Sequence, residues 1–302
     1  MNIGVFGKSI PSEYLPAIQR LFLQLIRAGG HLTFFEPFYN ELKRNYNIDI
    51  QGDTFINHLD INGKLDCLVS IGGDGTLLNT IALVRDSGIP VLGINTGRLG
   101  FLSSVSTEDI EQAADALFTK RYMLDQRTLI RLDSPSGLFG EVNYALNELA
   151  VYKKEPNTML TIHAWVNDLF LNSYWADGLI IATPTGSTAY SLSCNGPILH
   201  PGSGDFIITP IATHNLTVRP IVIPDNSVIR LKVEGRSNDF FVSLDSRFKA
   251  IDSTKEIMVV KEDFKINLIR MENQNFFSTI REKLKWGIDI RNYPNSNSTG
   301  LE

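Results

Sequence analysis

The spacing of apolar residues changes at about residue 120, and this change limits the folds open to the chain. Before that point, short apolar runs alternate with segments whose apolar residues recur every three to four positions, as in a buried strand followed by an amphipathic helix. After it, apolar and polar residues alternate with a period of two, which is typical of strands with one buried face. We therefore expect an α/β domain with a mostly parallel sheet over residues 1–120, and a mainly β, sandwich-like domain over residues 121–270.

The same patterns place the individual segments. In the first domain the expected strands lie at 2–7, 31–35, 67–71 and 89–94, and the expected helices at 11–28, 76–85 and 106–118, the last one capped by Ser106 or Thr107. In the second domain, 160–166 and 169–175 form an expected hairpin around Asn167 and Asp168, and 228–234 and further short strands run to about residue 270. A C-terminal helix within 271–291 is expected to pack back on the first domain, and residues 292–302 to be disordered.

The composition argues against several classes of protein. With 302 residues, 43% apolar and 20% charged, the chain is typical of a globular protein of two domains. A net charge of −5 disfavours nucleic-acid binding, because a phosphate backbone requires a basic face. No apolar stretch reaches the roughly 18 residues of a membrane helix, and the start has no signal-peptide pattern. The two cysteines suit a cytoplasmic protein, and the five histidines lack the spacing of metal ligands.

The stretch Gly72–Thr76 (GGDGT) lies between a buried strand and a helix. Glycines at such a turn let backbone N–H groups approach an anion, and the helix N-terminus adds positive potential, so the turn suits phosphate. Asp74 does not suit phosphate, because a carboxylate repels it. The carboxylate is useful there if it binds Mg²⁺ or takes a proton from an attacking hydroxyl. Phosphoryl transfer is therefore one interpretation, and an aspartate that caps the following helix is the other. The spacing alone does not separate them.

Four stretches together resemble the NAD kinase family. GGDGT is a signature that NAD kinases share with diacylglycerol and sphingosine kinases and, in a near variant, with 6-phosphofructokinases. Three more stretches resemble NAD kinases specifically: NTGRLGFL at 95–102, ALNELAV at 145–151 and DGLIIATPTGSTAYSLSCNGPILHP at 177–201. The resemblance covers about residues 2–270 in the same order. It implies a cytoplasmic enzyme that transfers the γ-phosphoryl group of ATP, or of polyphosphate, to the 2′-hydroxyl of the adenosine ribose of NAD.

The resemblance also implies roles for individual residues. Asp74 would be the base that activates the hydroxyl, and Mg²⁺ would be held through the phosphates of ATP rather than by protein ligands. The implied phosphate contacts are Gly72, Gly73, Gly75 and Thr76. The implied NAD contacts are Asp74, Gly75, Asn147, Glu148, Asp177, Thr188, Ala189, Tyr190, Ser191 and Ser193. The family further implies a homodimer or homotetramer, in which Asp177 can reach the substrate across a subunit contact.

The chain departs from the family pattern at a few positions. Trp175 stands where some bacterial relatives carry Arg, at a position associated with the choice between oxidised and reduced substrate, and Thr158 stands near another such Arg. Arg247 stands where Gln is common. Trp175 and Arg247 are therefore further candidate site residues, which leave the implied chemistry intact and the fine specificity open.

Three alternatives remain beside the NAD kinase interpretation. A lipid or sugar kinase could carry the same GGDGT turn, although this acidic chain shows no membrane-docking surface. A non-catalytic, regulatory NAD-binding module is a second alternative, but binding alone does not need the acid at Asp74. An NAD-dependent dehydrogenase is a third, but the first strand continues as GVFGKSIP without a dinucleotide-binding fingerprint.

Overall fold

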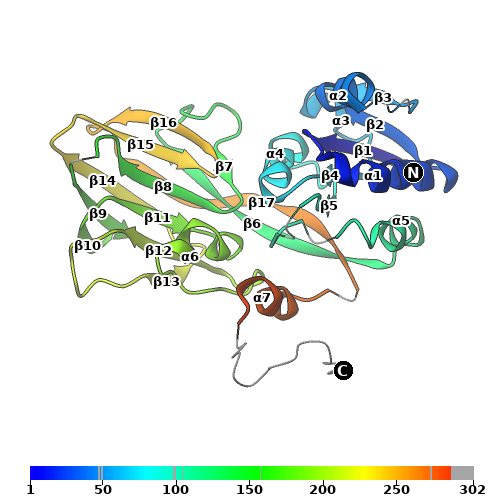
Figure 1. The fold of residues 1–302 in the computed structure, drawn as a ribbon. Helices are drawn as coiled ribbons and strands as arrows, with labels where there is room; N and C mark the ends of the chain where they lie inside the picture. The colour runs from blue at the N-terminus through cyan, green and yellow to red at the C-terminus, as the bar shows by residue number, and fades with distance from the viewer. Residues whose placement is uncertain are drawn as a thin grey trace.

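The computed structural model describes residues 1–286 except 47, 49, 98, 99, 104, 157 and 273. Figure 1 shows two lobes, which are joined by the long strands β6 (Tyr122–Ser134) and β17 (Ile257–Met271). The tail at 292–302 that we expected to be disordered lies outside the described residues. No helix in the described ranges is long and apolar enough to cross a membrane.

The N-terminal lobe is an α/β unit with a parallel sheet. Its strands pair in the order β3-β2-β1-β4-β5, and they are β1 (Asn2–Gly7), β2 (His31–Phe35), β3 (Asp53–Phe55), β4 (Cys67–Ile71) and β5 (Val91–Ile94). The helices are α1 (Leu15–Arg27), which follows the 3-10 turn η1 (Ser12–Tyr14), α2 (Glu36–Tyr46), α3 (His58–Ile61), α4 (Asp74–Val84) and α5 (Ile110–Thr119). Side chains of α1, α2 and α5 share one core cluster, and those of α3 and α4 share another. The strands alternate their side chains between the two clusters, so the sheet is covered on both faces.

The C-terminal lobe consists of two packed sheets. One sheet is antiparallel in the order β13-β12-β11-β8-β15-β16, and its strands are β8 (Glu148–Lys153), β11 (Gly178–Ala182), β12 (Asp205–Ile211), β13 (Ile221–Pro224), β15 (Asp239–Leu244) and β16 (Arg247–Asp252). The other contains β9 (Leu160–Val166), β10 (Leu169–Ala176), β14 (Ile229–Gly235) and part of β17. Ile229, Leu231 and Val233 are buried between the sheets, as their alternation predicts. The expected fold class, α/β followed by a β sandwich, is confirmed.

Strand β17 continues from one lobe into the other. It pairs with β14 at one end and, at Leu268, with β5 at the other, so a single eleven-stranded sheet extends through both lobes. β6 runs antiparallel along it and also pairs with the short β7 (Tyr144–Ala145). The expectation of only short strands up to residue 270 is wrong, because a register shift between Lys261 and Lys265 breaks the alternation inside one 15-residue strand. The division of the chain near residue 120 stays a prediction.

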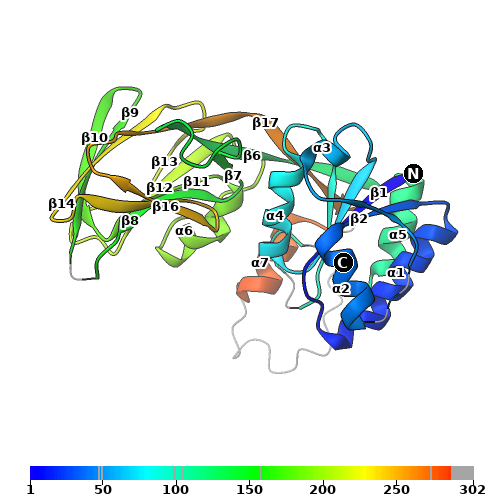
Figure 2. The ribbon, with the colours of Figure 1, turned by 90° about the horizontal axis from the view of Figure 1, so that it is seen from above.

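Three helix starts differ from expectation, and α2 and α3 were not predicted. α1 begins at Leu15, four residues later than predicted, because the 3-10 turn η1 takes up Ser12–Tyr14. α5 begins at Ile110, after Asp109, because the Ser106 hydroxyl donates to the Asp109 carboxylate (2.9 Å) instead of capping the helix. α4 begins at Asp74, two residues earlier than predicted. The last described helix, α7 (Phe276–Leu284), lies at the junction of the two lobes (Figure 2). Its Phe276 ring packs 5.3 Å from the ring of His200, which follows α6 (Tyr190–Ser193) in the chain. This position brings α7 beside the candidate site.

Candidate active site

The Gly72–Thr76 turn lies at the carboxyl end of β4, where α4 begins. Gly72 has a φ of +148°, and a Cβ there would lie 2.3 Å from Thr76 Oγ1, so the turn requires glycine at this position. In contrast, no atom of the described residues lies within 4 Å of a Cβ built on Gly73 or Gly75, so this part of the structure leaves both sides of Asp74 open. The N–H groups of Thr76 and Leu77 donate to the Gly73 carbonyl, so those of Asp74 and Gly75 at the start of α4 are the ones that can bind an anion in this opening.

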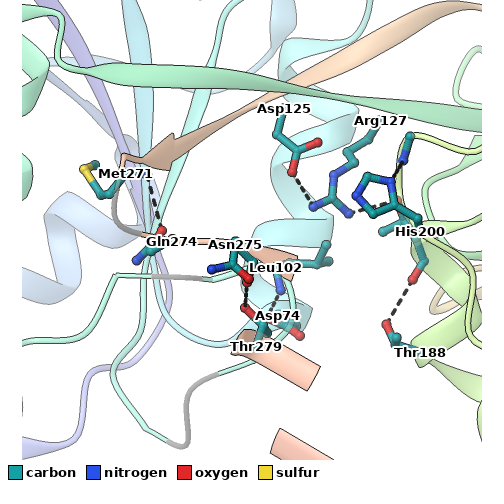
Figure 3. A network of polar contacts seen from close by, with 12 residues as sticks. Asp74, Leu102, Asp125, Arg127, Thr188, His200, Met271, Gln274, Asn275 and Thr279 are labelled. Carbon is teal, nitrogen blue, oxygen red and sulfur yellow. Dashed lines mark hydrogen bonds and ion pairs between the residues drawn. The ribbon is translucent and has the colours of Figure 1, made fainter. Parts of the chain in front are cut away.

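The Asp74 side chain holds the loop that follows β5. Its Oδ2 accepts the N–H of Phe101 at 2.8 Å, and its Oδ1 accepts that of Ser103 at 2.9 Å. Oδ1 also accepts the Leu102 N–H at 3.1 Å (Figure 3). A Cβ at Gly100 would lie 1.9 Å from Oδ1, so this close approach requires glycine. The N-cap of α4 is Gly73, with no side-chain capping bond, so the helix-cap interpretation of Asp74 is wrong. Three N–H groups instead orient the carboxylate at the open turn.

A second carboxylate, Asp245, holds the Asn147–Glu148 pair. It accepts the N–H groups of Leu146, Asn147 and Glu148 at 2.9, 2.8 and 3.3 Å, and its own N–H donates to the Glu148 carbonyl at 3.0 Å. Asp245 lies in the turn between β15 and β16 with a φ of +52°. The sequence analysis did not identify this role, because the partners lie about a hundred residues away in the chain.

Glu148 is a buried carboxyl group beside another carboxyl group. It is 9% exposed, and its Oε2 has no hydrogen-bond partner within the described part of the chain. Burial and the negative charge of Asp245 raise the pKa of Glu148 to about 8, against the opposing effect of the Tyr190 N–H. Glu148 therefore retains a proton near neutral pH and can donate a hydrogen bond to a ligand.

The TPTGST segment, residues 183–188, packs directly on the Asn147 backbone. The Thr183 N–H donates to the Asn147 carbonyl at 2.8 Å, and a Cβ at Gly186 would lie 2.0 Å from the same oxygen. The segment forms the 3-10 turn η2 (Thr185–Thr188) followed by α6. These contacts join two of the predicted motifs into one unit.

The NAD contacts predicted along this unit differ in their exposure. Thr188 and Ala189 are half-buried, and Tyr190 and Ser193 are exposed. Ser191 is fully buried, and its Oγ lies 2.8 Å from Thr209 Oγ1. The Ser191 hydroxyl therefore supports the turn from beneath rather than lining an opening.

Asp177 and Tyr190 line a cavity of about 380 Å³ in the C-terminal lobe. The Asp177 carboxylate forms an ion pair with the Lys153 ammonium at 2.7 Å. Tyr152 and Phe248, the latter 60% exposed, add two more aromatic side chains, and Asp245 connects the cavity to the Asn147–Glu148 pair. Aromatic rings and polar groups in one cavity suit a nucleotide base or a nicotinamide ring.

Trp175 and Arg247 are not among the residues that line this cavity. The Trp175 ring is 52% exposed, packs 5.0 Å from the His214 ring, and lines a separate hollow that also contains Thr158. The Arg247 guanidinium donates to the carbonyl groups of Val142 and Tyr144 and so supports the backbone that leads into the Asn147–Glu148 pair. The structure thus brings two of the departures from the family pattern, Trp175 and Thr158, to one place.

Arg127 lies between the two halves of the site (Figure 3). It is 8% exposed, pairs with Asp125 at 2.8 Å, and donates to Thr185 Oγ1 at 3.2 Å. Arg127 and Phe276 of α7 line two small cavities, which adjoin the loop held by Asp74 and the TPTGST segment. Sequence reasoning missed Arg127, since its stretch QRTL carries no recognisable motif. Within the described ranges, no group of three or more His, Cys, Asp or Glu side chains could hold a metal ion.

Comparisons with known proteins identify the family. Residues 3–122 match the family described as the ATP-NAD kinase N-terminal domain, and residues 146–271 match the ATP-NAD kinase C-terminal domain. The chain is 45% identical over 293 residues to an NAD kinase of Cytophaga hutchinsonii, an alignment that covers 97% of this chain and 100% of that protein. The chain belongs to the NAD kinase family.

Other members of the NAD kinase family agree with this result. An NAD kinase of Flavobacterium psychrophilum is 46% identical over 294 residues, with 97% of this chain and 100% of that protein covered. The fold matches a yeast NADH kinase complexed with NADH (TM-score 0.82, 23% identity, 100% of this chain and 90% of that chain). It also matches an NAD kinase from Archaeoglobus fulgidus in complex with ATP (TM-score 0.71, 24% identity, 94% and 99%). The resemblance is confirmed, and the lipid-kinase, sugar-kinase and dehydrogenase alternatives are disfavoured.

Proposed function

We propose that this chain is an NAD kinase, which transfers the terminal phosphoryl group of ATP to the 2′-hydroxyl of the adenosine ribose of NAD. The observation that carries the proposal is the Asp74 carboxylate, held by three N–H groups in a glycine turn that is open on both sides. Phosphoryl transfer to a hydroxyl needs a phosphate cradle and a proton acceptor at one place. The Asp74 turn offers both.

The Asp74 carboxylate accepts the proton of the ribose hydroxyl while the hydroxyl oxygen attacks the terminal phosphorus of ATP, and ADP leaves with the bridging oxygen. The N–H groups at the start of α4 bind the phosphates of ATP through the open positions Gly73 and Gly75. Because the Phe101–Ser103 loop already orients the carboxylate, little reorganisation is needed to reach the reactive geometry.

The C-terminal lobe holds NAD in this proposal. The Asn147 amide and the protonated Glu148 carboxyl offer both donors and acceptors to the polar edges of the substrate. Tyr190 offers a ring face for stacking, and Asp177 lies in the same cavity. The other predicted NAD contacts flank Tyr190, with Ser191 acting beneath the surface.

The surroundings of Asp74 fit a Mg²⁺ ion carried by ATP better than one held by the protein. Both Asp74 oxygens already accept N–H groups, and the only other side-chain oxygen of the turn is the Thr76 hydroxyl. Mg²⁺ on the phosphates supplies positive charge that offsets their repulsion of Asp74. The homo-oligomeric assembly and the cytoplasmic location stay predictions from the family resemblance.

A phosphotransfer assay tests the proposal. NAD, ATP and Mg²⁺ are supplied, NADP is read with an NADP-specific dehydrogenase, and NADH and polyphosphate are tried in parallel. Asp74→Asn keeps one oxygen for the N–H groups of Leu102 and Ser103, so we expect it to keep the fold and NAD binding. We expect its rate to fall on the order of 10²-fold or more, because the amide accepts no proton. Asp115→Asn, at an exposed position on α5, is the matched control.

Two results would contradict the proposal. A wild-type chain that binds NAD but makes neither NADP nor NADPH under any of these conditions is not an NAD kinase. A folded Asp74→Asn variant with a near-normal rate would leave the kinase assignment intact but show that Asp74 is not the base.

A further inference from the structure

Helix α7 lies beside the loop that holds Asp74. Thr279 lines a small cavity together with Phe101 and Leu102, the residues whose N–H groups bind Asp74 (Figure 3). The helix is anchored there, because Ile280 is 4% exposed and the Asn275 side chain caps the first turn by accepting the Ser278 N–H at 2.9 Å. One face of α7 is therefore directed at the loop that holds Asp74.

Lys283 lies on this face of α7. It follows Thr279 by four residues, and residues at this spacing are neighbours on a helix surface, about 6 Å apart. The Lys283 side chain is half-buried, whereas Arg281 and Lys285 on either side of it are exposed. Burial lowers the pKa of Lys283, and the negative charges of Glu282 and Asp74 oppose this shift. The ammonium group thus lies within electrostatic reach of Asp74.

The two charges attract each other without forming an ion pair. The Asp74 oxygens accept hydrogen bonds from backbone N–H groups, and no contact within 4 Å joins them to Lys283 in the described structure. A direct ion pair would tie up the proposed base. The carboxylate and the ammonium can therefore each act on a third group that binds at the turn.

The chemistry of the turn indicates what that group is. Gly72–Thr76 contains neither lysine nor arginine, so the turn itself offers an incoming triphosphate backbone N–H groups and the Thr76 hydroxyl but no cationic side chain. During transfer, negative charge spreads over the three equatorial oxygens of the phosphoryl group. A fixed cation beside the base stabilises that charge more than it stabilises the bound substrate.

We propose that Lys283 binds the terminal phosphate of ATP at the Asp74 turn, so that α7 forms part of the active site together with the turn and the C-terminal lobe. The inference rests on the proposed kinase function. The ammonium group binds phosphate oxygens as a compact point charge. It approaches the donor from the side of α7, across the space from the α4 N-terminus. The phosphoryl group then lies between the base that receives the proton and the cation that offsets its charge.

The test compares Lys283→Met with Lys283→Arg and Arg281→Met. The first variant keeps the apolar stem and removes the charge, the second keeps the charge, and the third removes a charge from the exposed side of the same helix. For each variant we would measure kcat and KM for ATP and for NAD, the Tm, and the calorimetric affinities for NAD and for a non-hydrolysable ATP analogue with Mg²⁺.

We expect Lys283→Met to lower kcat/KM for ATP by about 10²-fold, as for loss of one group that stabilises transition-state charge. Its affinity for the ATP analogue should fall by about 10-fold, or about 1.4 kcal/mol, while KM for NAD and the Tm stay unchanged. Lys283→Arg should stay within about 10-fold of wild type, and Arg281→Met within about 2-fold, since an exposed charge on the far side is screened by water.

Each other outcome overturns the inference in a recognisable way. If the wild type is active and Lys283→Met behaves like Arg281→Met, Lys283 does not bind the donor and the proposed function stands. If Lys283→Met lowers the Tm and the affinities for both ligands together, Lys283 supports the fold instead. If the wild type transfers no phosphoryl group to NAD, the proposed function itself fails, and the inference fails with it.

Discussion

Gly100→Ala tests whether the position of the Asp74 carboxylate controls the reaction. A Cβ at residue 100 would lie 1.9 Å from Asp74 Oδ1, whereas real Cβ contacts are not shorter than 3.0 Å. The carboxylate or the loop must therefore move by at least the difference, about 1.1 Å. A displacement of about 1 Å at a reacting group can lower the rate by about 10²-fold. We expect kcat to fall by about that factor, equivalent to about 2.7 kcal/mol of activation free energy.

The assay is steady-state NADP formation, with NAD affinity by calorimetry and the Tm measured on the same samples. Gly97→Ala is the matched control in the same loop, because the one atom of the described residues found within 4 Å of its Cβ is Asn95 Oδ1 at 3.9 Å. We expect Gly97→Ala to stay within about 2-fold of wild type, since an ordinary contact displaces nothing. A folded Gly100→Ala variant that binds NAD and keeps its kcat would refute the link between this close contact and catalysis.

Three further predictions concern the C-terminal lobe. Gly186→Ala should lower the free energy of unfolding by about 2 kcal/mol or more in urea titrations, since its Cβ would lie 2.0 Å from the Asn147 carbonyl, whereas Gly204→Ala, with open space around it, should have little effect. Arg247→Met should lower the same free energy by about 1–3 kcal/mol, because two backbone carbonyls lose their donor. The pKa of Glu148, raised from 4.5 to about 8, means that the native state binds this proton more tightly than the unfolded chain, so stability falls as pH rises from about 4.5 to about 8. Glu148→Gln should flatten that part of a plot of Tm against pH, and an unchanged slope would show that Glu148 ionises normally.

Patterns among neighbouring residues in the sequence predicted the strands and turns whose geometry depends on those neighbours alone. The strand at Asn2–Gly7 was placed to the residue, and Asn167 and Asp168 form the predicted turn, both with positive φ as a two-residue hairpin requires. β17 was missed because its register shift interrupts the alternation and because its pairing with β5 joins residues 268 and 91. Neither feature has a periodic signal in the sequence.

The candidate site shows the same division between local and distant information. GGDGT, the Asn147–Glu148 pair and the TPTGST segment were found as motifs, but their contacts were not. The partners of Asp74 lie 27 to 29 residues away along the chain, and those of Asp245 lie 97 to 99 away. The apolar spacing of α7 predicted a helix, yet nothing in that spacing indicates that Lys283 lies within electrostatic reach of Asp74. The motifs identify the reacting groups, but only the fold shows which backbone groups orient them.

Asp74 and Asp245 make the same kind of contact with the backbone but serve different substrates of the proposed reaction. Each carboxylate holds three successive N–H groups of a distant segment. Their electrostatic surroundings differ: Asp74 lies at the N-terminus of α4 with Lys283 nearby, whereas Asp245 lies beside Glu148. An anionic triphosphate is favoured at the first carboxylate and repelled at the second. We infer that ATP presents its phosphates to the N-terminal lobe and that NAD offers hydrogen-bonding edges to Glu148, which places the ribose hydroxyl at the junction between them.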